Sequence, residues 1–134
     1  MNNLVFVYGS LKQGFHNNRL LNDAQFVCKA LTINNDYDMR SLGGFPGVTK
    51  LENGYHVTGE IYNVNDYTLE NLDRLESNGT FYKREKIKAI SLSQPAAKAY
   101  DVWIYVLLRD SYGSVNNVEQ LVLENNEVAL TWGK

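Results

Sequence analysis

The sequence predicts an α+β fold, in which a small mixed β-barrel, closed or nearly closed, is flanked by short helices. Nine tyrosines against two prolines favour strands, because strands prefer aromatic and β-branched residues. Six or seven segments have the apolar pattern of a strand, whereas one segment of substantial length has helical periodicity. A doubly wound sheet would need more helices. The length of 134 residues is typical of one domain, so residues 1–134 are expected to form a single domain.

The first strand is expected close to the N-terminus. A continuous apolar run over residues 4–8 predicts a strand that is buried on both faces. Residues 9–14, which begin and end with glycine, are expected to form a loop, and residues 16–21 a short helix. A second loop is expected over residues 42–47, where three glycines and a proline would interrupt strand pairing.

The middle of the chain carries a hairpin signal and a helix signal. Asn53 and Gly54 separate two apolar runs, and this pair supplies the two positive-φ residues of a type I′ hairpin turn. A helix is expected to follow, capped by Asn65 or Asp66 and ending near Glu76. These signals predict a hairpin over residues 48–64 that leads directly into the helix.

Further strands are expected on both sides of this helix. Residues 100–108 are apolar on both faces, which is typical of a central strand. The C-terminal segment 118–124 is expected to form a short helix or a strand, and residues 128–132 are expected to close the sheet. The other segments with strand character are residues 24–33, 37–41 and 81–92.

The composition excludes several classes of protein. A net charge of −2 lacks the basic excess that nucleic-acid-binding proteins normally show. No apolar run approaches the ~20 residues that cross a bilayer. The first expected strand begins too early for a signal peptide to precede it, so a cytoplasmic location is predicted. One cysteine and two histidines allow no internal disulfide and give no zinc-ligand pattern, so no metal or organic cofactor is expected.

The segment after the first strand is one candidate binding site. The strand ends at Tyr8, and Gly9 and Ser10 follow. Successive backbone N–H groups in such a turn can form a nest that binds an anion. A plain strand-to-helix connection is the alternative. The segment is not a phosphate-binding P-loop, because no Lys-Ser or Lys-Thr pair follows Gly14.

Glu76 is the candidate for proton transfer. At helical spacing it lies on the same stripe as Leu69 and Leu72, which are expected to face the core. Desolvation and the carbonyls at the helix C-terminus should both disfavour its charged form and raise its pKa. A carboxyl group held in such a place is a candidate acid or base. The alternative is a frayed helix end, with the carboxylate reaching water.

Other polar residues carry weaker signals. Glu60 lies on an expected strand and is either a second inward carboxylate or a solvated or ion-paired residue. Cys28 is expected to pack as a small apolar residue. His16 and His56 have no neighbouring serine or cysteine that would suggest a catalytic triad.

Four short motifs occur in an order that resembles the gamma-glutamylcyclotransferase-like superfamily. The resemblance covers about residues 4–108, and its spacing is closest to the gamma-glutamylamine cyclotransferase branch. The motifs are Tyr-Gly-Ser-Leu at residues 8–11, Phe-Pro at 45–46, Gly-Glu-Ile-Tyr at 59–62, and Leu-Asp-Arg-Leu-Glu at 72–76 followed by Tyr82.

This resemblance implies an enzyme that cyclises a gamma-glutamyl amine or amino acid to 5-oxoproline and releases the amine. It implies Glu76 as the general acid/base and no metal or organic cofactor. The expected partner is a small gamma-glutamyl substrate, with no nucleic acid and no membrane, and the protein is expected to be a monomer or homodimer. The residues that the resemblance assigns to substrate binding are Tyr8, Gly9, Ser10, Leu11 and Tyr82.

Two alternatives from other functional classes stay open at this stage. The same barrel and loop could hold a small anionic metabolite without turnover, as a binding module. The tyrosine-rich surface could instead bind another protein, although the sequence shows no apolar stripe for such an interface. The place of Glu76 on an apolar stripe favours the enzyme.

Overall fold

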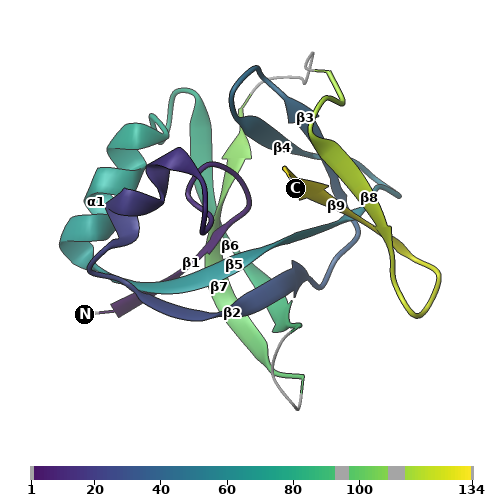
Figure 1. Cartoon of the computed structure of the whole chain (residues 1–134), viewed down its shortest axis with the longest axis horizontal. Helices are drawn as coiled ribbons and strands as arrows, with labels where there is room; N and C mark the ends of the chain where they lie inside the picture. The colour runs from purple at the N-terminus through teal and green to yellow at the C-terminus, as the bar shows by residue number, and fades with distance from the viewer. Residues whose placement is uncertain (1, 93–96, 109–113, 134) are drawn as a thin grey trace.

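Five strands close into a mixed barrel in the computed structural model, which describes residues 2–92, 97–108 and 114–133 (Figure 1). Four of the five strand pairings are antiparallel, and β1 and β7 pair in parallel. The α+β barrel that the sequence predicts is therefore confirmed. In order around the barrel, the strands are β1 (Asn2–Val7), β7 (Ala99–Leu107), β6 (Tyr82–Ser91), β2 (Gln25–Thr32) and β5 (His56–Asn65), which returns to β1.

Strand β1 is buried on both faces, as its sequence predicts. The Phe6 side chain packs in the barrel interior, in a cluster that also holds Ile61 and Ile104. Val5 and Val7 point the other way and belong to a second cluster, which packs the outside of the barrel against the helices. Because alternate residues of a strand face opposite sides, a strand between two apolar layers needs an unbroken apolar run.

The two helices lie on the side of the barrel that carries this second cluster (Figure 1). Helix α1 spans Asp66–Leu75, and the Asn65 side chain caps it by accepting a hydrogen bond from the Thr68 N–H at 2.8 Å. The predicted cap and helix end are both confirmed. The short helix η1 (His16–Leu21) has the predicted bounds but 3₁₀ geometry. Leu21 and Leu72 anchor the two helices in the same cluster.

The predicted hairpin around Asn53 is wrong. Strand β4 (Pro46–Lys50) pairs with β3 (Tyr37–Ser41) in a separate two-stranded ribbon, and no ladder joins β4 to β5. Asn53 does adopt a positive φ of 56°, but it lies in a turn that only connects the ribbon to the barrel. The reason is competition for partners, because β1 and β2 occupy the two edges of β5.

The predicted loop over residues 42–47 is also wrong, because it extends too far at its C-terminal end. Pro46 is the first residue of β4 and lies opposite Ser41 in the ribbon. A proline is tolerated at the first position of a strand, since its missing N–H need not contribute to the ladder there. The ribbon packs on the barrel through Tyr37, Met39 and Val48, and Phe45 and Pro46 lie at its turn.

The C-terminal segments extend the sheet rather than closing it. Residues 118–124 contain a strand, β8 (Val118–Val122), which pairs with β9 (Val128–Trp132). Strand β9 runs parallel to the first two residues of β5, beyond the part of that strand that pairs with β1. Barrel closure instead comes from the pairing of β1 with β5. Within the described residues, no helix is long and apolar enough to cross a membrane.

Candidate active site

A cavity of about 220 Å³ opens at the end of β1, and it contains every residue that the sequence singles out for the site. Tyr8, Gly9, Ser10 and Leu11 line it from the loop after β1, Glu76 from the end of α1, and Tyr82 from the start of β6. The barrel thus brings together three segments that are far apart in the sequence. The remaining lining residues include His16, Asn17, Phe45, Pro46, Leu75, Phe81 and Tyr105.

The loop after β1 is folded as a tight turn that lines the cavity. The Lys12 N–H donates to the Gly9 carbonyl at 3.0 Å, and the Asn17 side chain donates to the Ser10 hydroxyl at 2.9 Å. Among the described residues, no group accepts a hydrogen bond from the N–H groups of Ser10 and Leu11. These two donors are available to an anionic ligand.

Two contacts to distant strands, one to β5 and one to β9, hold this loop in place. Glu60 on β5 accepts hydrogen bonds at one carboxylate oxygen, Oε1, from the Gln13 N–H at 2.9 Å and the Tyr62 hydroxyl at 3.2 Å. The Lys12 ammonium donates to the Trp132 carbonyl on β9 at 2.6 Å. Glu60 is 8% exposed, shares the outer face of β5 with Tyr62, and lies outside the cavity lining. It is a buried carboxylate that positions the loop.

The close packing of Gly9 explains why this position is a glycine. A Cβ atom built at Gly9 would lie 2.7 Å from the ring carbons Cγ and Cδ of Pro46. The carbonyl of Pro46 in turn accepts a hydrogen bond from the Tyr82 hydroxyl at 2.8 Å. Gly9 therefore lets the ribbon turn close over the loop, and a larger residue would push apart two walls of the cavity.

Glu76 lies at the C-terminal cap of α1, where its N–H donates to the Leu72 carbonyl at 2.9 Å. Within the described part of the chain, its carboxylate has no hydrogen-bond or ion-pair partner. Burial raises the pKa of Glu76 to about 7. The expected increase in this pKa is confirmed, and desolvation is its cause. Near neutral pH the group can therefore both accept and return a proton.

Three tyrosines surround this carboxyl group, and their hydroxyl protons are used by the protein itself. The Tyr8 hydroxyl donates to the Tyr105 carbonyl at 2.7 Å, and the Tyr82 hydroxyl donates to the Pro46 carbonyl. The Tyr105 hydroxyl donates to Asp73 at 2.6 Å. Burial is the largest cause that raises the pKa of Tyr8 and Tyr82, and the negative charge of Glu76 adds to it. All three phenols stay neutral in this pocket.

Comparison with known proteins identifies the family. The family model described as gamma-glutamyl cyclotransferase, AIG2-like, matches residues 5–126. The chain belongs to the AIG2-like gamma-glutamyl cyclotransferase family. The superfamily resemblance drawn from the motifs is thereby confirmed, and the match extends beyond residue 108 into the C-terminal segments.

Relatives from bacteria and animals agree with this placement in the AIG2-like family. The chain is 34% identical over 105 residues to the gamma-glutamylcyclotransferase family protein YtfP of Escherichia coli, covering 78% of this chain and 82% of that one. It is 42% identical over 93 residues to Troponin C-akin-1 of Drosophila melanogaster, covering 60% and 53%. The crystal structure of an AIG2-like protein from Mus musculus superposes with a TM-score of 0.72 at 25% identity, covering 83% and 80%.

The structure also reveals residues beside this AIG2-like pocket that the sequence did not indicate. Asp73 on α1 accepts two hydrogen bonds from Arg84, at 2.8 and 3.0 Å, and a third from the Tyr105 hydroxyl. Its place three residues before Glu76, on the same helix face, was a signal that could have found it. Tyr105 lies on β7, and its role depends on a contact that only the closed barrel creates.

His16 lies in the cavity lining, whereas Cys28 and His56 lie outside it. Cys28 is buried in the barrel interior, as expected of a small apolar residue. The His56 ring contacts the Thr32 carbonyl at 2.9 Å and the Glu127 carboxylate at 2.7 Å, which ties the β8–β9 region to the barrel. In the described ranges, no three His, Cys, Asp or Glu side chains lie close enough together to hold a metal ion.

Proposed function

We propose that this protein is a gamma-glutamyl cyclotransferase that converts a gamma-glutamyl amine or amino acid to 5-oxoproline and releases the amine. The observation that supports this proposal most is the Glu76 carboxyl group, which faces a cavity without a partner and has a pKa of about 7. A structural carboxylate in a buried site normally has hydrogen bonds or a cation. Glu76 is instead suited to general acid/base catalysis at neutral pH.

The proposed reaction is an intramolecular acyl transfer that consumes no water. Glu76 takes a proton from the substrate's α-ammonium group, whose pKa in a peptide reference is about 7.7–8. The freed amine attacks the γ-carbonyl carbon, so a carbon–nitrogen bond forms and a five-membered ring closes. The bond from that carbon to the leaving nitrogen then breaks, and Glu76 returns the proton to this nitrogen. The attacking nitrogen loses a second proton as the ring forms, and this proton also goes to the leaving nitrogen. The products are 5-oxoproline and the amine in its ammonium form.

The loop would supply the binding and orientation that the ring closure requires. The free N–H groups of Ser10 and Leu11 can bind the α-carboxylate or the oxyanion that develops on the γ-carbonyl oxygen. Tyr8, Gly9 and Tyr82 shape the cavity around the glutamyl chain. Holding a flexible chain in its ring-closing conformation removes a large part of the activation free energy, since effective molarities of intramolecular reactions reach about 10⁵–10⁸ M.

The proposed reaction needs neither a metal ion nor an organic cofactor, because the nucleophile and the leaving group belong to one molecule. Its partner is a small gamma-glutamyl compound rather than a nucleic acid or a membrane. Among the family's substrates, the gamma-glutamylamines are the proposed class. A cytoplasmic location and a monomeric or homodimeric state stay predictions.

The proposal is tested by measuring 5-oxoproline release from a panel of gamma-glutamyl compounds. Glu76→Gln should lower kcat by about 10²–10⁴, because an amide cannot carry the proton between the two nitrogens. It should still bind a gamma-glutamyl compound in a calorimetric titration. Glu70→Gln is the matched control, since Glu70 is an exposed residue of the same helix. Its kcat should equal that of the wild type.

Two results would contradict the proposal. If wild-type protein binds a gamma-glutamyl compound tightly but releases no 5-oxoproline, the protein is a small-metabolite-binding module. If Glu76→Gln turns over within a few-fold of wild type while Glu60→Gln is inactive, the general acid/base is Glu60 instead.

A further inference from the structure

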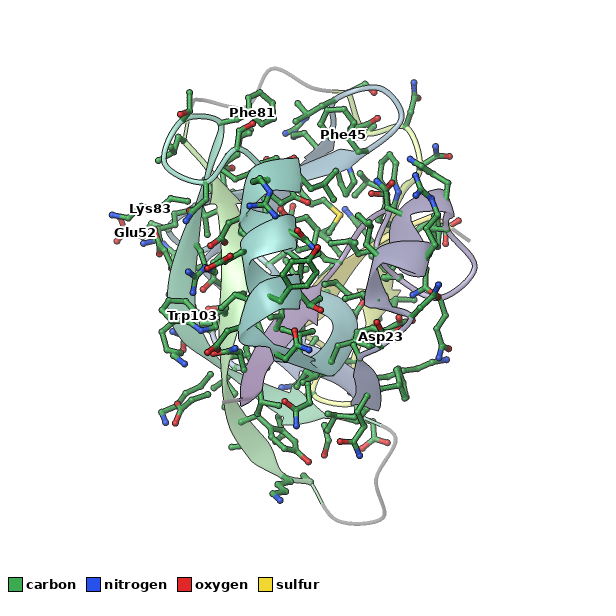
Figure 2. The ribbon with its side chains drawn as sticks, turned by 90° about the vertical axis from the view of Figure 1, so that its left-hand side faces the viewer. Asp23, Phe45, Glu52, Phe81, Lys83 and Trp103 are labelled. Carbon is green, nitrogen blue, oxygen red and sulfur yellow. The ribbon has the colours of Figure 1, made fainter. Side chains whose placement is uncertain are left out.

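Strand β8 lies at the outer end of the sheet. It pairs with β9 on one side, and no described strand pairs with its other side. The residues from Glu119 to Val122 are all exposed, Leu121 to 44% and Val122 to 73%. Helix α1 covers the side of the barrel that faces the viewer in Figure 2, whereas β8 lies on the opposite side of the molecule (Figure 1). The outer edge of β8 is therefore open to another strand.

The pairing of β8 with β9 leaves alternate backbone groups of β8 unused. Just after the strand, the Leu123 N–H donates to the Glu127 carbonyl at 2.8 Å. Since hydrogen-bonded positions alternate along an antiparallel pair, the backbone groups of Leu121 also face β9, and those of Gln120 and Val122 face outward. No described residue accepts a hydrogen bond from the N–H of Gln120 or Val122. These groups are available to a further strand.

The backbone along this edge is complementary to a second copy of itself. An antiparallel pair with Gln120 opposite Gln120 of the second copy also puts Val118 opposite Val122. Each Gln120 N–H then donates to the Gln120 carbonyl of the other copy, and each Val122 N–H to the Val118 carbonyl. The Val118 N–H already donates to the Val115 carbonyl at 3.1 Å, and this register does not require it. The two-fold pair therefore has four hydrogen bonds.

The side chains of β8 suit the same register. It places Glu119 opposite Leu121 of the second copy, so the two glutamates of the pair do not face each other, which would be destabilising. Natural proteins usually prevent an exposed edge from pairing with lysine, proline or a bulge. The five residues of β8 include no lysine or proline, and their pairing with β9 has no register shift. The edge thus lacks the features that would keep a second strand away.

We propose that the outer edge of β8 binds a second copy of this protein, whose own β8 pairs antiparallel to it in a two-fold homodimer centred on Gln120. The sheet then continues from one copy into the other. Because each copy contributes a strand of only five residues, the dimer is reversible, with a dissociation constant of about 1–100 µM. This inference does not depend on the proposed cyclotransferase function, and its tests use no substrate.

Sedimentation equilibrium of the full chain measures the association, and amide hydrogen exchange locates it. The protein should change from monomer to dimer between about 1 and 500 µM. When about nine-tenths of the chains are dimeric, exchange at the N–H groups of Gln120 and Val122 should be about tenfold slower, because these groups are protected only in the dimer. The Leu121 N–H faces β9 in both states, so its exchange is the control and should change much less.

Two substitutions of Leu121 test the register. Both remove the exposed leucine, and both place the new charge opposite Ala129 within the chain, so they are matched for their effect on folding. Leu121→Glu puts a second carboxylate opposite Glu119 of the other copy, twice in each dimer, and should raise the dissociation constant about tenfold or more. Leu121→Lys puts an ammonium group there and should stay within a few-fold of wild type. Combining Leu121→Glu with Glu119→Lys should restore the dimer.

Three results would overturn this inference. A wild-type chain that stays monomeric at about 500 µM has no such dimer. A dimer in which exchange at Gln120 and Val122 is unchanged uses another surface. If Leu121→Glu and Leu121→Lys weaken the dimer equally, the contact is a general apolar one without the proposed register. Should the wild-type monomer instead show slowed exchange at these two amides when an unrelated extended peptide is added, the edge of β8 binds another protein rather than a second copy.

Discussion

Two carboxylates in this protein, the buried Glu60 and the half-buried Glu76, have opposite environments. Glu60 lies in the barrel wall, and its Oε1 atom accepts hydrogen bonds from a loop N–H and from a tyrosine hydroxyl. Glu76 lies at the end of a helix beside a cavity, and no described residue donates to it. Both sites withdraw a carboxyl group from water, but only the barrel-wall site compensates for the lost hydration. The pKa of Glu76 rises to about 7 as a result.

This difference separates a positioning residue from a candidate catalytic residue. Glu60 fixes the backbone of the loop at Gln13 through a hydrogen bond that requires no ligand. Glu76 keeps its proton-transfer capacity because no protein group competes for its oxygens. The fold thus uses one carboxylate to build the binding loop and leaves the other free to react. Four predictions follow from this comparison, in order of decreasing size.

The largest effect is expected in the pH dependence of turnover. If ionised Glu76 accepts the substrate proton, kcat/KM should decrease as the pH falls below an apparent pKa of about 7. Between about pH 8 and pH 5 the decrease should reach about a hundredfold, because about one Glu76 in a hundred is still ionised at the lower pH. In Glu76→Gln the limb near pH 7 should be lost, and the residual activity should instead follow deprotonation of the substrate's α-ammonium group, with a pKa of about 7.7–8. A limb that stays near pH 7 in Glu76→Gln would show that another protein group controls it.

The second effect is on folding stability. Because the pKa of Glu76 is about 7 in the folded protein against an ordinary value of 4.5, its ionisation opposes folding. The cost is absent below pH 4.5, grows as the pH rises and is complete above pH 7. Glu76→Gln should therefore be more stable than wild type by about 2 kcal/mol above neutral pH, after allowance for partial access to water.

Urea denaturation of wild type and Glu76→Gln across this pH range measures the difference. The two proteins should have nearly equal unfolding free energies in acid and should diverge as the pH rises. A constant difference at every pH would mean that Glu76 is fully solvated and would remove the basis for its raised pKa.

The third effect is the cost of removing the barrel-wall carboxylate. Glu60→Ala leaves the Gln13 N–H and the Tyr62 hydroxyl without this acceptor, so the unfolding free energy should fall by about 1–3 kcal/mol. The loop should also become more mobile, which faster amide hydrogen exchange at Gln13 would report. Unchanged exchange at this amide would show that Glu60 does not hold the loop.

The smallest effect is expected for Glu60→Gln. A glutamine retains a side-chain oxygen that can accept both hydrogen bonds made by Oε1. The unfolding free energy should therefore change by less than about 0.5 kcal/mol, and kcat should stay within a few-fold of wild type. The change from glutamate to glutamine should therefore leave kcat nearly unchanged at Glu60 and greatly reduce it at Glu76. A large loss of kcat in Glu60→Gln would show that Glu60 is not merely a positioning residue.

Local sequence patterns predicted the elements that depend on neighbouring residues. The strand over residues 37–41, the cap at Asn65 and the doubly buried run of β1 follow from periodicity and capping chemistry, which act within a few residues. Glu76 was found in the same way, from its spacing to Leu72. The raised pKa followed because both burial and helix position could be inferred from that spacing.

The wrong predictions concern which segments, distant in the sequence, pair with one another. Asn53 adopts the positive φ that its sequence favours, yet β4 pairs with β3 because β1 and β2 fill the edges of β5. The link from Asp73 to Tyr105 spans 32 residues and exists only once β7 has joined the barrel. A single sequence gives the preferences of each segment but not the competition among them, which tertiary packing decides.

The contact between Lys12 and the Trp132 carbonyl has a consequence for the order in which the molecule is made. The two residues are 120 positions apart, so the loop emerges from the ribosome long before the strand that holds it. A nascent chain can form the first strand and the helix while only the Glu60 contact holds its binding loop. Completion of the pocket therefore waits until β9 has been made, and chains that lack β9 should bind a ligand more weakly.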